Sequence, residues 1–230
     1  HYCYLPLYIF AGDQLLCARL RPANIDAAAG ALEEVRRIVE QLRRVWPDVE
    51  ILLRAGGGFC RDEMLSWCEA NAVGYVIGLP KNGRLQRRIQ RRMKLARRRF
   101  VKIGAAARAF GDFRYRTRKS WSRRRRVVAK AEYLAKGENP RFVVTSLTAR
   151  QAAAQQVYET IYRARGEMEN RIQEQQMGLF ADRTSTASLR SNQIRLYFSS
   201  IGYCVLEALR RLGLAGTKMA RAQCTTIRPR

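Results

Sequence analysis

The stretch that decides the fold is Tyr162–Asn170, which reads YRARGEMEN and continues to Gln176. Its residues Tyr162, Arg165, Glu169 and Gln176 are spaced by three, four and seven positions. At about 100° per helical residue, their side chains fall within about 60° of one another, on one polar stripe. An apolar stripe accompanies it, formed by Val157, Ile161, Met168, Ile172 and Leu179. The pattern predicts a helix that buries one face and presents a carboxylate along its edge. An ordinary amphipathic helix with solvated charges is the alternative.

The composition indicates a globular, strongly basic protein. The 230 residues include 44 Lys and Arg against 19 Asp and Glu, for a net charge of +25. Such an excess repels itself unless a polyanion neutralises it, so nucleic acid is the expected partner. A membrane is the weaker alternative, because the uncharged stretch between Arg195 and Glu207 has 11 residues. A bilayer span needs about 20.

The six cysteines are scattered without a C-x-x-C pair, and no signal peptide is present. Both features predict free thiols in a reducing compartment, and hence a cytoplasmic protein. His1 is the only histidine, which excludes zinc sites with His ligands and Ser-His or Cys-His catalysis. Any chemistry would rely on carboxylates and metal ions. The chain begins without Met in the strand-like segment Tyr2–Phe10, which predicts a fragment lacking its true N-terminus.

Hydrophobic patterns predict an alternation of strands and helices up to Pro80. The expected elements are a β-hairpin at Tyr2–Phe10 and Gln14–Leu20, a helix from Asn24 or Asp26 to about Val45, a strand at Val49–Leu53, a helix at Arg61–Asn71 and a strand at Gly74–Leu79. This order predicts an α/β layer with parallel pairing and right-handed crossovers.

The character of the chain changes after Pro80. Residues 81–130 hold 21 Lys and Arg and a single acid, Asp112, which gives +20 in 50 residues. We expect one helix and then antiparallel strands in this region, followed by two long helices. The predicted ranges are Asn82–Phe100, Phe113–Arg118, Arg124–Leu134, Arg141–Leu147, 149–179 and Leu189–Leu212.

Arginine clusters interleaved with aromatic residues predict nucleic-acid binding in this basic block. Arginine forks suit phosphate oxygens, and aromatic faces suit stacking on exposed bases. A solvated charged face is the alternative, but such a face usually carries acids for balance. The candidate nucleic-acid-binding residues are Arg97, Arg98, Arg99, Arg114, Arg116, Arg118, Lys119, Trp121, Arg123, Arg124, Arg125 and Arg126.

A glycine run, Gly56-Gly57-Gly58, follows a predicted strand and precedes a predicted helix, where α/β proteins bind ligands. Read alone, it indicates a methyltransferase-like small-molecule pocket. That interpretation requires an acid at the end of the next strand, which instead ends Ile77-Gly78-Leu79-Pro80-Lys81. No Gly-Lys-Ser/Thr follows, so a P-loop is absent.

The spacing Y-x2-R-x3-E-x6-K resembles the signature of the DDE transposases of bacterial insertion sequences, with Gln176 where the family has Lys. Other segments are similar to blocks of one insertion-sequence group. They are Tyr4–Phe10, Ala18–Asp26, Phe59–Arg61 and Phe180–Ser185. The resemblance covers essentially all 230 residues.

This resemblance implies an α/β, RNase H-like core with a basic, β-rich insertion before the last catalytic helix. Residues 1–80 would form the first part of that core without its first strand, 81–147 the insertion, and 148–230 the C-terminal helical part. It also implies Mg²⁺-dependent DNA cleavage and strand transfer on insertion-sequence ends and target DNA. A homodimer on DNA, association with the nucleoid and no membrane contact are further expectations.

The family carries three acids, and the resemblance places them residue by residue. Glu169 matches the late-helix acid and would be a catalytic metal ligand, with Tyr162 and Arg165 positioning DNA ends or phosphates beside it. Gly56 stands where the family has its second acid, and the first acid belongs to a strand before Tyr2. Because Mg²⁺ usually needs one or two carboxylates beside substrate phosphate, one Glu is not expected to hold two ions. The expectation is a truncated, inactive transposase that keeps its DNA affinity; the alternative is a non-catalytic nucleic-acid-binding protein.

Overall fold

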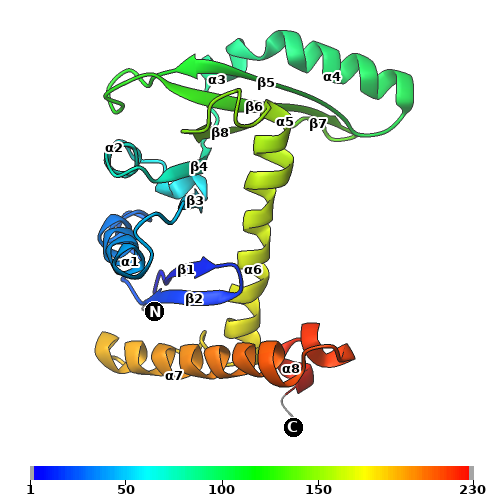
Figure 1. Ribbon diagram of the computed structural model, residues 1–230. Helices are drawn as coiled ribbons and strands as arrows, with labels where there is room; N and C mark the ends of the chain where they lie inside the picture. Colours follow the sequence, from blue (N-terminus) through cyan, green and yellow to red (C-terminus); the bar gives the residue numbers. More distant parts are fainter. Residues whose placement is uncertain (1–2, 228–230) are drawn as a thin grey trace. The chain divides into compact units, whose positions relative to one another are not determined.

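The computed structural model describes residues 3–227 and divides them into two compact units (Figure 1). Unit 1 contains the residues up to Ala29 and those from Gly166 onward, and unit 2 spans Gly30–Arg165. The expected three-part division at residues 80 and 147 is based on where the charge of the sequence changes, whereas these two units are defined by contacts between residues. The three-part division stays a prediction.

Unit 2 is built on a mixed six-stranded sheet. Its strand order is β3 (Leu52–Ala55), β4 (Gly74–Leu79), β8 (Arg141–Thr145), β6 (Arg125–Leu134) and β5 (Ala107–Tyr115), with short β7 (Gly137–Glu138) beside β6. Strands β3 and β4 are parallel, and the other neighbours are antiparallel. The predicted α/β class and both kinds of pairing are confirmed. Since β8 pairs with β4, the strands of the basic block extend the same sheet.

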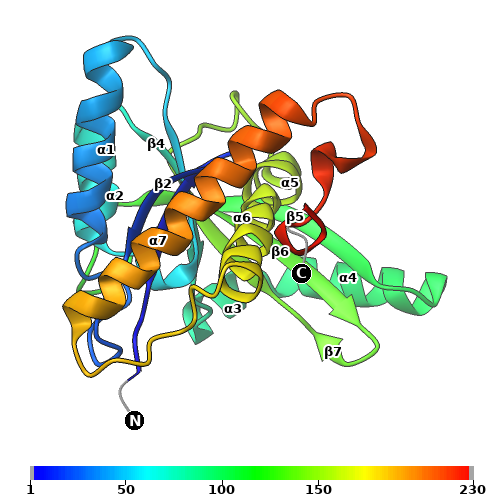
Figure 2. The same ribbon diagram turned by 90° about the horizontal axis from the view of Figure 1, so that it is seen from below.

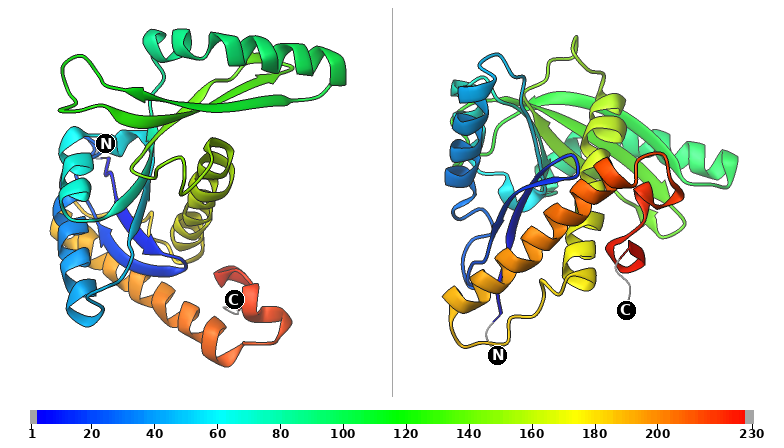
Figure 3. Two further views of the ribbon diagram at one scale, coloured as in Figure 1. Left: turned by 45° about the horizontal axis from the view of Figure 1, so that its top comes forward. Right: turned by 60° about the horizontal axis from the view of Figure 1, so that its bottom comes forward.

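Helices flank this sheet and complete its core. They are α1 (Ala31–Val45), α2 (Asp62–Ala70), α3 (Gly83–Arg88), α4 (Gln90–Ile103) and α5 (Ala154–Gln156), followed by a π-helical segment at Val157–Tyr162 and a 3-10 turn at Arg163–Arg165. Figure 3 shows α4 lying along the ribbon of β5 and β6. Val76, Val128, Val143 and Val157 form a fully buried core between sheet and helix.

Unit 1 packs a hairpin against a long helix. Its elements are β1 (Leu7–Ala11), β2 (Gln14–Arg19), α6 (Gly166–Gln173), a π-helical segment at Glu174–Gly178, α7 (Leu189–Ala208), a second π-helical segment at Leu209–Gly213, a 3-10 turn at Lys218–Arg221 and α8 (Cys224–Ile227). The strands β1 and β2 pair antiparallel, as predicted. Figure 2 shows α7 crossing the hairpin, and Tyr8, Ala18, Leu20 and Leu196 form the core between them.

Two helices begin later than predicted, each for a local polar reason. The side chain of Asp26 accepts a hydrogen bond from the Ala28 amide at 2.7 Å, which closes a turn rather than a helix. Gly30 then adopts a left-handed conformation (φ 73°), so α1 starts at Ala31. Similarly, Thr148 and Gln151 bond each other's backbone amides at 2.9 and 3.3 Å, and the long helix begins only at Ala154.

Other boundaries differ too. The one helix predicted at Asn82–Phe100 is two helices, α3 and α4, that break at Ile89. The first strand, predicted at Tyr2–Phe10, lies at Leu7–Ala11, and Tyr2 is outside the described residues. The strand predicted at Val49–Leu53 lies at Leu52–Ala55, and the one predicted to start at Phe113 already starts at Ala107. Within residues 3–227, none of the helices combines the length and the apolar character that crossing a membrane requires.

Candidate nucleic-acid interface and strand-end site

Tyr162 reaches the backbone at the ends of β3 and β4. Gly56 follows β3, and Gly78 lies in the adjacent strand β4. A Cβ atom on Gly78 would lie 2.6 Å from the Tyr162 hydroxyl oxygen and 2.8 Å from the Gly57 amide nitrogen. Only glycine permits this approach, so the sequence brings the Tyr162 hydroxyl to the loop that carries Gly56.

Arg165 stacks on Tyr162. The two residues are joined by a 3-10 turn, in which side chains three positions apart eclipse each other. The guanidinium carbon of Arg165 lies 5.6 Å from the centre of the Tyr162 ring, within cation–π range. Arg54 of β3 donates to the carbonyl of Ile161 at 3.3 Å and ties this helix to the strand. Unit 2 therefore assembles Tyr162, Arg165 and the Gly56 loop at one edge of its sheet.

Glu169 is exposed and lies in α6, which belongs to unit 1. Gln176 is half-buried in the π-helical segment that follows α6. The single stripe expected for Tyr162, Arg165, Glu169 and Gln176 assumed a uniform α-helix. The helix changes from π to 3-10 to α and back to π over these residues, so a constant 100° per residue does not hold.

The residues at the strand end do not fit a magnesium site. Mg²⁺ requires oxygen ligands in octahedral geometry, and Gly56 has no side chain to offer one. Over residues 3–227, no group of three or more His, Cys, Asp or Glu side chains is placed to hold a metal ion. Position 56 nevertheless has room, since a Cβ there would meet no atom within 4 Å. Its extended backbone (φ −72°, ψ 171°) is open to any residue.

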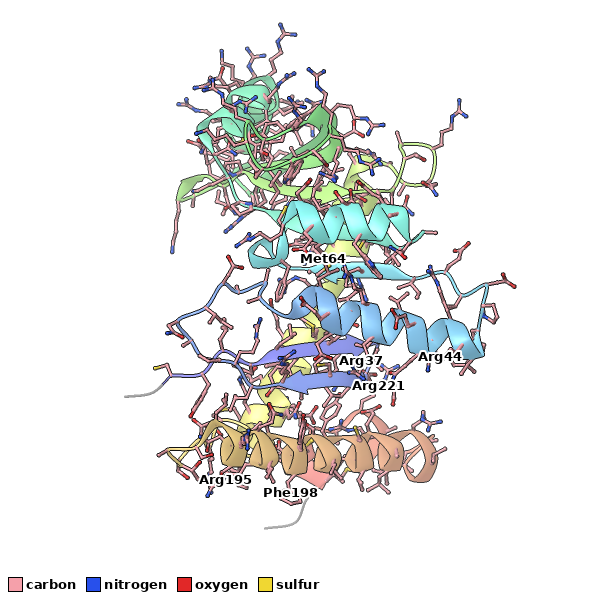
Figure 4. The ribbon with its side chains drawn as sticks, turned by 90° about the vertical axis from the view of Figure 1, so that its left-hand side faces the viewer. Arg37, Arg44, Met64, Arg195, Phe198 and Arg221 are labelled. Atoms are coloured by element: carbon pink, nitrogen blue, oxygen red, sulfur yellow. The ribbon has the colours of Figure 1, made fainter. Side chains whose placement is uncertain are left out.

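Nine of the predicted nucleic-acid-binding residues are exposed in unit 2, and we call them the basic surface. They belong to α4, to the end of β5 and to the loop before β6, and Figure 4 shows nitrogen-tipped side chains projecting from this end of the unit. The basic surface comprises Arg97, Arg98, Arg99, Arg114, Arg116, Arg118, Lys119, Arg123 and Arg124.

Arg125 is buried, at 2% exposure, inside a cluster of acids. Its guanidinium donates to Asp62 at 2.6 Å, to Glu69 at 2.7 and 3.1 Å and to Ser66 at 2.9 Å. Burial opposes the charged form of Glu69, but hydrogen bonds from Arg125 and Tyr75 outweigh it and lower the Glu69 pKa. The pKa of Asp62 is lowered in the same way, by Arg125 and Ser122. Arg125 is thus occupied within the protein, and we leave it out of the basic surface.

Arg126 and Trp121 are buried as well. Arg126 donates to Asp112 at 2.6 Å and to the carbonyls of Leu147 and Ala152 at 2.9 and 3.0 Å. Trp121 packs edge-on against Tyr115, with ring centres 5.9 Å apart, and lies beneath Arg125. Trp121 therefore anchors the loop that carries Arg116, Arg118 and Lys119, and its ring is not open to a nucleobase.

Two acids from outside the basic block, Asp62 and Glu69, pair with arginines of the block. Glu69 also pairs with Arg123, at 2.8 Å. Both Asp62 and Glu69 lie on α2, about 60 residues before their partners, so counting acids within 81–130 missed them.

A depression of about 400 Å³ lies beside this cluster, lined by Arg114, Arg124, Ser146 and Thr148 among others. It places hydroxyl groups next to exposed guanidinium groups.

Comparisons with known proteins connect this architecture to a family. The model of the family described as transposase DDE domain group 1 matches residues 1–230. A search of curated proteins found no match. The mixed sheet with flanking helices is consistent with the RNase H-like domain of such transposases, which use DNA as partner and generally a divalent metal ion. The family match covers the whole sequence, and the chain belongs to the DDE transposases.

Proposed function

We propose that this chain is an insertion-sequence transposase domain that binds DNA through the basic surface and no longer cleaves it. Its motif would be of the Y-x2-R-x3-E type, with Tyr162 and Arg165 contacting DNA phosphates and Glu169 as the one remaining metal-binding acid. The family's ion would be Mg²⁺, and two copies would act together on DNA. The observation that carries the loss of cleavage is Gly56, which has no ligand atom at the strand end.

The separation of two arginine groups supports DNA binding. Arg99 donates to the carbonyl of Arg108 near the start of β5, at 3.0 Å, and Arg114 lies at the other end of that strand. Six residues of strand at about 3.3 Å each separate the two groups by roughly 20 Å. Double-stranded DNA carries one charge for about every 1.7 Å of its axis, counting both strands, so phosphates are dense enough for both groups to contact one duplex.

Salt-dependent binding tests the DNA interface. Wild-type protein is titrated into a 30-base-pair duplex of arbitrary sequence between 50 and 300 mM KCl, with fluorescence anisotropy as readout. Replacing Arg97 and Arg98 together with Gln should weaken binding and reduce the slope of log K against log salt by about 2, roughly one for each lost phosphate contact.

A matched pair on another helix serves as control. Arg37 and Arg44 are exposed on α1 (Figure 4), and Arg37 pairs with Glu34 of the same helix at 3.0 Å. Replacing both with Gln removes the same charge and should leave the slope unchanged. Equal effects of the two double variants would show that net charge, not the basic surface, governs binding.

A nicking assay tests the loss of cleavage. Supercoiled plasmid incubated with the protein and Mg²⁺ or Mn²⁺ should stay supercoiled at protein concentrations that fully shift a DNA fragment. Metal-dependent nicking that survives in Glu169→Gln would indicate a contaminating nuclease. Nicking that disappears in Glu169→Gln would refute the proposed loss of activity.

A further inference from the structure

Helix α7 buries a face of mixed character, with Leu196 and Tyr203 among polar residues, and exposes an apolar face. The face packed within unit 1 includes the buried polar residues Asn192, Ser199, Ser200 and Glu207. The opposite face carries Ile194, Phe198, Ile201 and Val205, each between 53% and 70% exposed. Figure 4 labels Phe198 on the side of α7 turned away from the hairpin. Contiguous exposed apolar side chains of this kind usually mark an interaction surface.

Specific hydrogen bonds fix α7 in this orientation. Asn192 donates to the carbonyl of Thr186 at 2.8 Å and to the hydroxyl of Tyr4 at 3.1 Å. Ser200 accepts from Gln175 at 2.8 Å, and the Tyr203 hydroxyl donates to the carbonyl of Asp13 at 2.8 Å. Rotating the helix to bury its apolar face would break all of these bonds. The exposed stripe is therefore built into unit 1.

The exposed stripe has the spacing of a coiled-coil seam. Ile194, Phe198, Ile201, Val205 and Ala208 follow one another at intervals of four, three, four and three residues. A repeat that averages 3.5 residues keeps one line of side chains facing a partner helix of the same kind. Tyr197 and Leu209 flank the seam and are also exposed.

The apolar area approaches that of a self-association interface. The exposed apolar side chains on this side of α7 and in the segment after it offer roughly 60–100 Å² each. They are Ile194, Tyr197, Phe198, Ile201, Val205, Leu209 and Leu212. Together they supply roughly 400–700 Å² per copy, against about 800 Å² per partner in a standard interface.

We propose that this seam, Ile194 to Ala208 of α7, binds the same seam of a second copy of the chain in an antiparallel arrangement. The residues before and after a seam decide helix direction, because they face each other across it. In a parallel pair, Arg190 of each copy would face Arg195 of the other copy, so two pairs of positive charges would repel each other. An antiparallel pair separates these arginines and sets Ile201 of both copies together at the two-fold axis.

The seam would be the contact surface of the homodimer named under the proposed function, and this contact does not require DNA. Sedimentation velocity in 0.5 M salt without DNA measures it directly, at 1–50 µM protein. Wild type should sediment as a dimer. Ile201→Glu should shift the midpoint of dissociation at least tenfold towards higher concentration, because two carboxylates would meet at the axis.

Ile103→Glu is the matched control. Ile103 is an equally exposed helical isoleucine, at 67%, and lies on α4 of unit 2. This variant should remain a dimer, and far-UV circular dichroism should show both variants folded. A monomeric wild type would overturn the proposal, as would a dimer that Ile201→Glu leaves intact. Binding of wild-type monomer to uncharged vesicles that Ile201→Glu abolishes would assign the face to lipid instead.

Cross-linking tests the direction of the helices. Cys3 and Cys204 are exposed, and both are first replaced with Ser. In that background, Ile201→Cys should form a disulfide-linked dimer on oxidation, whereas Ile194→Cys should not. Equal cross-linking at both positions would indicate a parallel seam and refute the antiparallel arrangement. DNA binding by the Arg97 and Arg98 variant is measured separately, so either proposal can fail alone.

Discussion

Arg124 and Arg125 are neighbours in sequence, and replacing each with Ala should have opposite consequences. Arg125 is buried between the carboxylates of Asp62 and Glu69, whereas Arg124 is exposed. Removing Arg125 leaves Asp62 and Glu69 without their buried partner, although Glu69 keeps its ion pair with the exposed Arg123. Removing one partner of a buried ion pair costs about 3–5 kcal/mol. Asp62 and Glu69 keep 26% and 15% of their side-chain surface, so we take the low end, about 3 kcal/mol.

Thermal unfolding measures this difference. For a chain of this length, about 3 kcal/mol corresponds to a fall in Tm of roughly 6–12 °C. Arg124→Ala removes an exposed side chain and should stay within about 0.5 kcal/mol of wild type. In the DNA titration, Arg124→Ala should have the larger effect and Arg125→Ala the smaller one. Arg124→Ala should reduce the salt slope by about 1, and Arg125→Ala, assayed below its Tm, should leave the slope unchanged.

The pH dependence gives an independent check on Arg125. The pKa values of Asp62 and Glu69 are lowered in the folded state, so their contribution to stability is complete above the unfolded values, near pH 4. It is lost as pH falls through the lowered folded values. The stability gap between wild type and Arg125→Ala should therefore be full at pH 7 and shrink below pH 4. The reasoning fails if Arg125→Ala keeps the wild-type Tm and instead weakens DNA binding as Arg124→Ala does.

Four further substitutions probe the strand end and the core of unit 1. Gly56→Asp should change the Tm by less than about 2 °C in a thermal-shift assay, because the backbone is extended and a Cβ at this position meets no other atom. A larger fall in Tm would show that the loop is more tightly packed than this. Gly78→Ala should lower the free energy of unfolding in urea by about 1–3 kcal/mol, because its Cβ would meet the Tyr162 hydroxyl and the Gly57 amide. Adding Tyr162→Phe to this variant should restore only part of the loss, since the contact with the backbone amide remains. Full rescue by Tyr162→Phe would contradict that geometry. Glu174→Gln should cost about 2 kcal/mol at pH 7, because buried Arg210 loses one of its two carboxylate partners and keeps Glu207. An unchanged urea midpoint would show that the Arg210–Glu174 pair contributes nothing.

Regular hydrophobic spacing made much of the fold predictable. The apolar run Gly74–Leu79 and the long pattern from Leu189 appear as β4 and α7 at or near the predicted ends. The two late helix starts fall where a polar side chain bonds the nearby backbone. Asp26 is an acceptable helix start by residue type, but its carboxylate closes a tight turn instead. Composition alone cannot separate these two uses of an aspartate.

The candidate site was predictable only in part. The Tyr162 and Arg165 spacing led to two side chains that stack on each other beside the Gly56 loop. Charge counting could not distinguish exposed arginines from Arg125, because the acids that enclose it are 56 and 63 residues away in sequence. Burial of a charge depends on long-range partners, which a local window does not contain.

The basic surface lies on a helix and on a loop that is held between two strands of a hydrogen-bonded sheet, and this has a thermodynamic consequence. Arg114 lies opposite Arg126 in the β5–β6 ladder, and β6 continues through β8 to β4. A disordered basic arm must lose about 1–2 kcal/mol of backbone entropy per residue when it settles on a polyanion. A sheet has already lost that entropy during folding. Association of a polyanion with unit 2 should therefore show a small heat-capacity change, unlike the large negative value of a segment that folds as it binds.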